Sequence, residues 1–235
     1  MEFKRIIVLA NSMKKGGRCV AGREVDGKEA TVGNWLRPIS DESEGELMSR
    51  HMVTANGLPV EVLDIVDVPL HHHANDKCHP EDWVLATSHP WKHRKQFLVK
   101  DLVGLEEKPR NLWLEDRSNT DRVTCDFLQH RKQQQSLYLL RPKNLRVRLW
   151  REFNPRKGYK QKKTRAIFDY GDAEFALSLT DPVATTRHCT DFPNVNEPPR
   201  EFTLPFRDNC LVCVSLTPVF NGFHFKVVAT VLELP

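Results

Sequence analysis

A chain of 235 residues, of which 40% are hydrophobic and 28% charged, has enough apolar surface to fold, which excludes wholesale disorder. Its uninterrupted apolar runs reach only about five residues, as in 6–10, too short for a membrane-spanning helix. The first residues also lack the cleavage pattern of a signal peptide. We therefore expect a cytoplasmic protein without a membrane partner, built as one mid-sized domain or two small ones.

The net charge of +4 conceals a strong asymmetry along the chain. Residues 141–165 contain eleven Lys or Arg and one acid, Glu152, which gives this segment a charge of +10. The other 210 residues therefore carry −6. A basic segment of this density indicates an acidic partner, either nucleic acid or an acidic protein surface.

Strand signals dominate residues 1–70. The first ten residues are rich in β-branched side chains, which is typical of a buried strand. Residues 18–25, 34–40 and 60–68 also have strand composition, and short turns separate them. We expect these elements to form a small barrel or curled sheet.

The middle of the chain, residues 71–135, has a different character. Histidine and proline are frequent near its start, and apolar residues recur at roughly helical spacing within 91–107. We expect a helical or irregular insert that completes the first lobe.

Strand signals return from residue 136 to residue 235. Leu145, Val147 and Leu149 alternate with arginines, so they predict a strand with one apolar and one basic face. The stretch 181–209 contains five prolines and several acids, and it predicts a long loop with one short helix. The expected strands are 137–140, 145–153, 164–170, 174–179, 210–216 and 223–234.

The six cysteines stand at irregular spacing, without an export signal, and predict free thiols in a reducing compartment. Cys210 and Cys213 lie three residues apart on an expected strand, where their side chains point to opposite faces. That geometry favours two core thiols over a shared metal ion or a disulfide.

Several segments together resemble the dual OB-containing domain family of bacteria. They are Lys4–Ala10 with Arg18–Gly22, Trp35–Ser40, Leu112–Trp113 with Asp121–Val123, Leu177–Pro182, Val214–Leu216 and Lys226–Ala229. The resemblance covers nearly the whole chain and implies a mainly β protein with two small OB-like barrels and an insert between them. It also implies genes of the prokaryotic conflict and mobile-element kind, such as antiviral defence. It supplies no catalytic residues, and the fold alone does not fix the function.

The basic segment is the strongest candidate site. Single-strand binders combine cations that track phosphates with aromatic faces that stack on bases, and Trp150, Phe153 and Tyr159 are interleaved with the cations here. An acidic protein partner or an inert solvated surface are the alternatives. The candidate nucleic-acid-binding residues are Arg146, Arg148, Arg156, Lys157, Tyr159, Lys160, Lys162, Lys163 and Arg165.

A second candidate cluster lies near the N-terminus. Trp35 and Arg37 share a face of an extended segment, and an indole beside a guanidinium suits a base or a phosphate. The alternative is that Trp35 belongs to the core and that Arg37 pairs with an acid such as Glu24 or Asp64. The cluster comprises Lys14, Lys15, Arg18, Arg23, Trp35 and Arg37.

A metal site has only weak support. His73, Cys78 and His79 carry ligand atoms suited to zinc, but no paired zinc-binding motif surrounds them. We therefore expect neither a metal nor another cofactor.

The sequence favours a non-catalytic module that binds or senses single-stranded or structured nucleic acid. The first alternative is a protein-interaction subunit of a larger assembly. The second is a nucleotide-processing enzyme in which residues 71–79 lie near Arg18 and Arg37.

Overall fold

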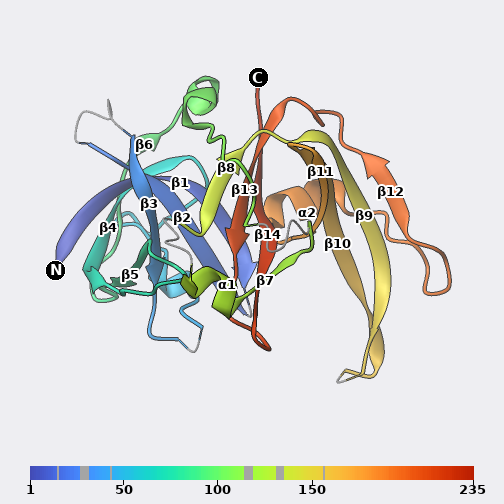
Figure 1. Cartoon of the computed structure of the whole chain (residues 1–235). Helices are drawn as coiled ribbons and strands as arrows, with labels where there is room; N and C mark the ends of the chain where they lie inside the picture. The colour runs from blue at the N-terminus through green and yellow to red at the C-terminus, as the bar shows by residue number, and fades with distance from the viewer. Residues whose placement is uncertain (15, 27–31, 43, 114–118, 131–134, 156) are drawn as a thin grey trace.

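The computed structural model describes residues 1–14, 16–26, 32–42, 44–113, 119–130, 135–155 and 157–235. Two of the candidate site residues, Lys15 and Arg156, lie outside these ranges. The described chain forms two β-sheets, one from each half of the sequence, which lie side by side in Figure 1. The prediction of a mainly β fold is therefore confirmed.

The first sheet contains six strands in the order β1-β2-β3-β5-β4-β6. β1 also pairs with β4, so the pairings run from β1 through β2, β3, β5 and β4 back to β1. All neighbours are antiparallel except β3 and β5, which are parallel. The strands are β1 (Glu2–Lys14), β2 (Gly17–Val25), β3 (Val32–Ile39), β4 (Asp64–His73), β5 (Asp82–Leu85) and β6 (Lys92–Gln96).

The first strand is apolar on both faces because both faces are buried. Ile6 and Val8 pack inside the first sheet, whereas Ile7 and Leu9 pack on the opposite side. That second side meets residues such as Cys213 from the second sheet. A continuous apolar run in place of alternation is the pattern expected for such a strand.

The second sheet contains the strand order of the first, because β9-β10-β11-β14-β13 correspond to β1-β2-β3-β5-β4. Its path is β12-β9-β10-β11-β14-β13-β8, with β7 paired to β14, and β11–β14 is again a parallel pair. Within the described residues β9 and β13 do not pair with each other; β12 pairs with β9, and β8 with β13. The strands are β7 (Arg122–Thr124), β8 (Leu137–Leu140), β9 (Lys143–Asn154), β10 (Tyr159–Tyr170), β11 (Ala173–Leu179), β12 (Arg200–Thr203), β13 (Cys210–Leu216) and β14 (Phe223–Glu233).

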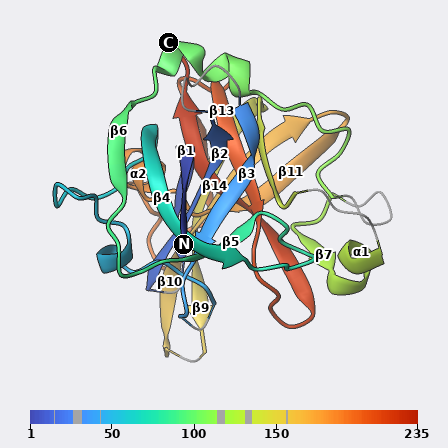
Figure 2. The ribbon, with the colours of Figure 1, turned by 90° about the vertical axis from the view of Figure 1, so that its left-hand side faces the viewer.

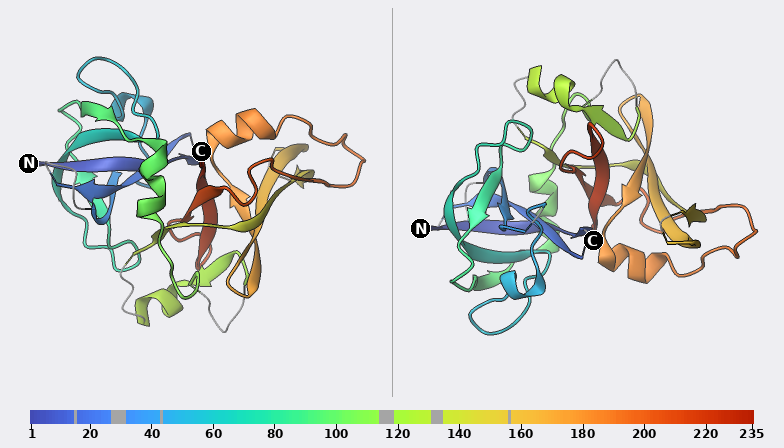
Figure 3. Two further views of the ribbon diagram at one scale, coloured as in Figure 1. Left: turned by 90° about the horizontal axis from the view of Figure 1, so that it is seen from above. Right: turned by 90° about the horizontal axis from the view of Figure 1, so that it is seen from below.

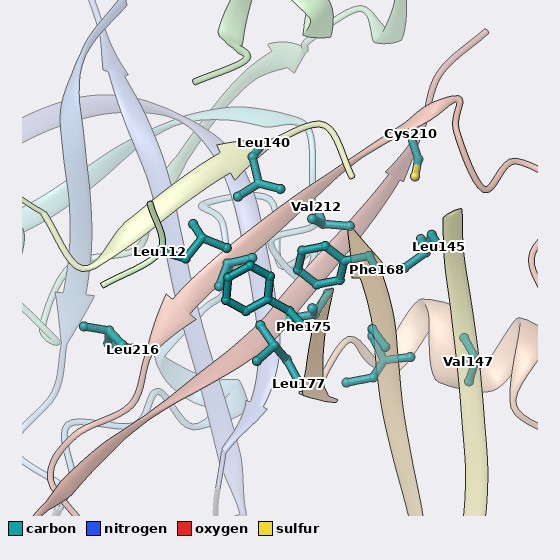
Figure 4. Close-up of a cluster of buried hydrophobic side chains, with 14 of the residues drawn as sticks. Leu112, Leu140, Leu145, Val147, Phe168, Phe175, Leu177, Cys210, Val212 and Leu216 are labelled. Atoms are coloured by element: carbon teal, nitrogen blue, oxygen red, sulfur yellow. The ribbon is translucent and has the colours of Figure 1, made fainter. Parts of the chain in front are cut away.

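The predicted alternation on β9 is confirmed. Leu145, Val147 and Leu149 are buried, whereas the arginines between them face outward. The buried residues join a core around Phe168 and Phe175, whose rings stack with centroids 5.8 Å apart (Figure 4). This core anchors the base of the long β9–β10 hairpin, which extends below the other strands in Figure 1.

Helical structure is sparse, and the helical spacing predicted within 91–107 is only partly correct. Residues 92–96 form strand β6, because their backbone pairs with β4, and only η2 follows as a 3-10 helix. Asp181 caps α2 by accepting hydrogen bonds from the backbone N–H groups of Val183 and Ala184. The helical elements are η1 (Ser49–His51), η2 (Val99–Leu105), α1 (Cys125–His130) and α2 (Pro182–His188).

Strand β6 differs from every other strand of the first sheet in its exposure. All five of its residues are exposed, and it pairs with β4 along one side (Figure 2).

None of the helices among the described residues has the length and apolar character needed to cross a membrane.

All six cysteines are free, as predicted, and four of them are buried: Cys78, Cys189, Cys210 and Cys213. Burial raises the pKa of Cys189 to about 11 and that of Cys210 to about 12. Since the thiolate is the reactive form, these thiols should resist modification in the folded protein.

A thiol-reactive chromogenic disulfide should therefore modify no more than two of the six cysteines in the native protein. Unfolding without reductant should expose six, and a lower total would indicate a disulfide.

Candidate nucleic-acid interface

The β9–β10 hairpin divides the basic segment between two faces. In the antiparallel register Arg148 lies opposite Arg165, and Trp150 lies opposite Lys163. Residues opposite each other share a face, so these four side chains lie on one side of the hairpin. Phe153 lies opposite Lys160 and shares the other face with Lys162.

The arginines near the base of the hairpin are already paired with acids. Arg146 contacts Glu201 and Glu174, each at 2.5 Å, and Arg148 contacts Glu201 at 2.7 Å. Hydrogen bonds from Arg148, despite partial burial, hold the pKa of Glu201 below its ordinary value. A phosphate would have to displace these carboxylates before it could bind the same guanidinium groups.

The cations on the middle of the hairpin also have internal partners. Arg165 pairs with Asp121 at 2.9 Å and lies beside the ring of Trp150, 5.9 Å from its centroid. Lys163 lies 3.5 Å from Glu152. Charge alone therefore overstates the attraction of this face for an anion.

The outer end of the hairpin is different. Phe153 is 57% exposed and Tyr159 is 55% exposed. Lys160 donates a hydrogen bond to the Val195 carbonyl at 2.7 Å. The structure places no acid within ion-pair distance of Lys157, Lys160 or Lys162 in the parts of the chain that it describes.

Lys162 is held in place by an aromatic ring. Its ammonium group lies 4.9 Å from the centroid of Phe192, in the loop that precedes β12. This contact positions the cation. No acid in the described ranges lies within ion-pair distance of Lys162, whereas the guanidinium groups at the base of the hairpin are paired.

The N-terminal cluster does not form a surface. Trp35 is buried, and its indole N–H donates to Glu107 at 2.9 Å. Arg23 lies beside the Trp35 ring and also pairs with Glu107, at 3.2 Å. The alternative in which Trp35 belongs to the core is the one that the structure supports.

Arg37 is buried between the two sheets. Its Nε donates to Asp82 at 2.6 Å, Nη2 lies 3.7 Å from Glu81, and Nη1 donates to the Leu216 carbonyl at 3.4 Å. Burial opposes the charged form, but Asp82 and Glu81 hold the pKa of Arg37 above its ordinary value. The expected acidic partner is thus present, but neither Glu24 nor Asp64 supplies it.

The tip of the β1–β2 hairpin packs against the second sheet. The Met13 N–H donates to the Thr180 carbonyl at 2.8 Å, directly before α2. Lys14 donates to the Glu44 carbonyl, and burial lowers the pKa of Lys14. Arg18 is partly buried and lines a cavity next to α2.

The three weak metal candidates do not converge. His73 uses its ring nitrogens on Asn75 Oδ1, at 2.9 Å, and on the Pro80 carbonyl, at 2.5 Å. Burial raises the pKa of Cys78, which disfavours the thiolate that zinc requires.

His79 does lie near two acids, with single ligand atoms of Asp76, His79 and Asp82 all within 4.8 Å of one another. Asp82 is already engaged by Arg37, and a hydrogen bond from His79 holds the pKa of Asp76 well below its usual range. These internal bonds account for the cluster without an ion.

A family model described as the dual OB-containing domain matches residues 4–231 of the chain. The chain belongs to the dual OB-containing domain family. This confirms the resemblance and agrees with the strand order that recurs in the two sheets. No curated protein and no solved structure matches the chain.

Within this dual OB-containing domain, sequence reasoning missed the acids that neutralise the hairpin arginines. Asp121, Glu174 and Glu201 lie between 28 and 55 residues from the arginines they pair with. It also missed Phe192, which positions Lys162. No local pattern marks any of these residues, because the pairings depend on the sheet register.

Proposed function

We propose that this protein is a nucleic-acid-binding module that holds a single strand along the outer end of the β9–β10 hairpin. Two exposed aromatic side chains carry the proposal: Phe153 shares a face of the hairpin with Lys160 and Lys162, and Tyr159 lies opposite Asn154 on the other face. Among the described residues no acid lies within ion-pair distance of these lysines. Aromatic faces accept stacked bases of any sequence, and the lysines follow the phosphates. Membership of an OB-containing family is in keeping with binding of this general kind.

The binding surface in this proposal is smaller than the basic segment. It comprises Phe153, Lys157, Tyr159, Lys160 and Lys162, which we call the hairpin end. Arg146, Arg148 and Arg165 stabilise the strand pairing through their acids and contribute little to phosphate binding. The distribution of ion pairs supports this division, because a neutralised cation releases few counterions when a strand binds.

The test is fluorescence anisotropy with a labelled oligonucleotide of mixed sequence, titrated at several salt concentrations. Binding should weaken linearly on a plot of log K against log salt, as counterions are released. If no binding is detected even at low salt, the proposal fails and the protein-interaction alternative takes its place.

Stacking can be measured separately from charge. Replacing Tyr159 with alanine should weaken binding by about 1–3 kcal/mol, because base–aromatic stacking contributes that much per base. The salt slope should stay unchanged, since no phosphate contact is lost. Phe220→Ala is the matched aromatic control, because Phe220 is 57% exposed and lies between β13 and β14, away from the hairpin end. A change of slope in the Tyr159 variant would contradict a stacking role.

A further inference from the structure

Cys125 and His224 face each other where β7 pairs with β14. The Cys125 Sγ atom lies 3.6 Å from the Nε2 atom of His224, although the two residues are 99 apart in the chain. Cys125 directly follows β7, and its backbone N–H donates to the Gly222 carbonyl at 3.4 Å. α1 begins at Cys125 and lies at the periphery of the molecule in both views of Figure 3. The strand pairing therefore holds a thiol against an imidazole near the surface.

The Thr217 carbonyl determines which nitrogen of His224 carries the proton. Nδ1 lies 2.8 Å from this oxygen, and a carbonyl oxygen can only accept, so Nδ1 is the donor. Thr217 is itself fixed to β14, because its N–H donates to the Phe225 carbonyl at 2.8 Å and its Oγ1 accepts from the Phe225 N–H at 3.0 Å. In a neutral imidazole Nε2 then has only a lone pair, so the thiol of Cys125 donates in the contact between them.

His224 is suited to accept the thiol proton. The residue is only 3% exposed, and this burial lowers the pKa of His224. Two nearby cations, His79 when protonated and Arg37, lower that pKa further. The bond to Thr217 and the charge of Asp76 act in the opposite direction. The His79 ring packs beside His224, with centroids 5.2 Å apart. The His224 ring is therefore neutral at neutral pH, with its basic nitrogen directed at the thiol.

Cys125 combines this partner with access to solvent. Four of the six cysteines are buried, which leaves Cys125 and Cys19 partly exposed. Within the described ranges no imidazole lies within hydrogen-bond distance of Cys19. An activated nucleophile needs a base within reach and a group that orients the base. The His224 ring and the Thr217 carbonyl supply these two parts for Cys125, and Cys19 is the internal reference without them.

We propose that Cys125 is a nucleophilic thiol, activated by His224, which forms a mixed disulfide with a small disulfide molecule. Cys125 Sγ attacks one sulfur of this molecule while the thiol proton moves to His224 Nε2. The S–S bond of the reagent breaks as the new S–S bond forms. The released thiolate takes the proton from His224 and leaves as a free thiol, so Cys125 is oxidised and the reagent is reduced. The proposal does not depend on nucleic-acid binding.

The test is the reaction of the full chain with excess hydroxyethyl disulfide, in which peptide mass spectrometry follows each cysteine over time. This reagent is uncharged, so attraction to local charges does not bias the comparison. Cys125 should react at least about tenfold faster than Cys19, because a positioned base contributes about 10²–10⁴ to a rate. Cys19→Ser should keep the fast reaction, and Cys125→Ser should abolish it. Modification of Cys19 first, or of both cysteines at equal rates, would overturn the proposal.

The pH dependence distinguishes a base from a side chain that only packs against the thiol. An unassisted thiol reacts as its thiolate, whose amount rises about tenfold per pH unit below the ordinary thiol pKa of about 8.5. The wild-type rate at Cys125 should change by less than about threefold between about pH 6.5 and pH 7.5, because His224 is already neutral there. A rise of about tenfold over this interval would contradict the proposal without recourse to any variant.

His224→Gln removes the base and keeps a donor for the Thr217 carbonyl, because glutamine donates through its amide but takes up no proton. The rate at Cys125 should fall about tenfold or more at neutral pH and should regain the steep pH dependence of an ordinary thiol. His93→Gln is the matched control, since His93 lies on β6 in the first sheet, 3.3 Å from Asp64. That control should keep the wild-type rate. An unchanged rate in a folded His224 variant would overturn the proposal; if the variant does not fold, the wild-type pH profile decides.

Discussion

Replacing Lys157, Lys160 and Lys162 together with glutamine should reduce the magnitude of the salt slope by about 2, because each single-strand phosphate contact contributes about 0.7. If the two lines meet at 1 M salt, the affinity at 50 mM salt falls by a factor of about 400. The wild-type slope should be about −2, because the hairpin end holds three lysines. Anisotropy titrations over a salt series measure both quantities.

The control removes cations from the base of the same hairpin without changing the net charge. Arg146, Arg148, Glu174 and Glu201 are all replaced with glutamine, which deletes the ion pairs as complete units. The slope of this variant should match that of the wild type. If the control loses as much affinity as the lysine variant, the strand binds along the whole basic segment. If neither variant loses affinity, the hairpin is not the binding surface.

Replacing Arg37 with methionine should lower the free energy of unfolding by about 3–5 kcal/mol. The substitution leaves the Asp82 and Glu81 carboxylates buried without the cation that now offsets their desolvation. Ser136 also donates to Glu81, so the loss affects contacts in both halves of the chain. Urea unfolding followed by tryptophan fluorescence measures the change.

An exposed ion pair provides the comparison for that result. Arg50 pairs with Glu42 at 2.6 Å, but its side chain is 65% exposed. Arg50→Gln should therefore change the free energy of unfolding by less than about 1 kcal/mol. A loss below about 1 kcal/mol in the Arg37 variant as well would contradict a structural role for the buried network.

The sequence predicted the features that depend on local pattern. The period-two alternation of Leu145, Val147 and Leu149 fixed the buried face of β9, because successive strand residues point to opposite sides. The apolar run in the first ten residues likewise predicted a buried strand, and the structure shows that both of its faces are covered. The family resemblance rested on several such segments and is confirmed over residues 4–231.

The features that sequence reasoning missed depend on contacts between distant segments. Asp82 lies 45 residues from Arg37, and Glu201 lies 53 from Arg148. The helical spacing within 91–107 failed for a related reason: pairing of residues 92–96 with β4 outweighed local preference. The contact between Cys125 and His224 leaves no local pattern either, since the two lie 99 residues apart.

The exposed strand β6 bears on how copies of this protein behave toward one another. A strand paired on one side offers backbone N–H and C=O groups that could template a strand from a second molecule. Here that strand reads Lys92, His93, Arg94, Lys95 and Gln96. Two such strands brought together antiparallel would place cationic side chains close to one another, which is unfavourable even though Asp67 offsets part of the Arg94 charge. The composition of β6 therefore keeps the first sheet from extending from one molecule to the next, and so protects the protein against aggregation.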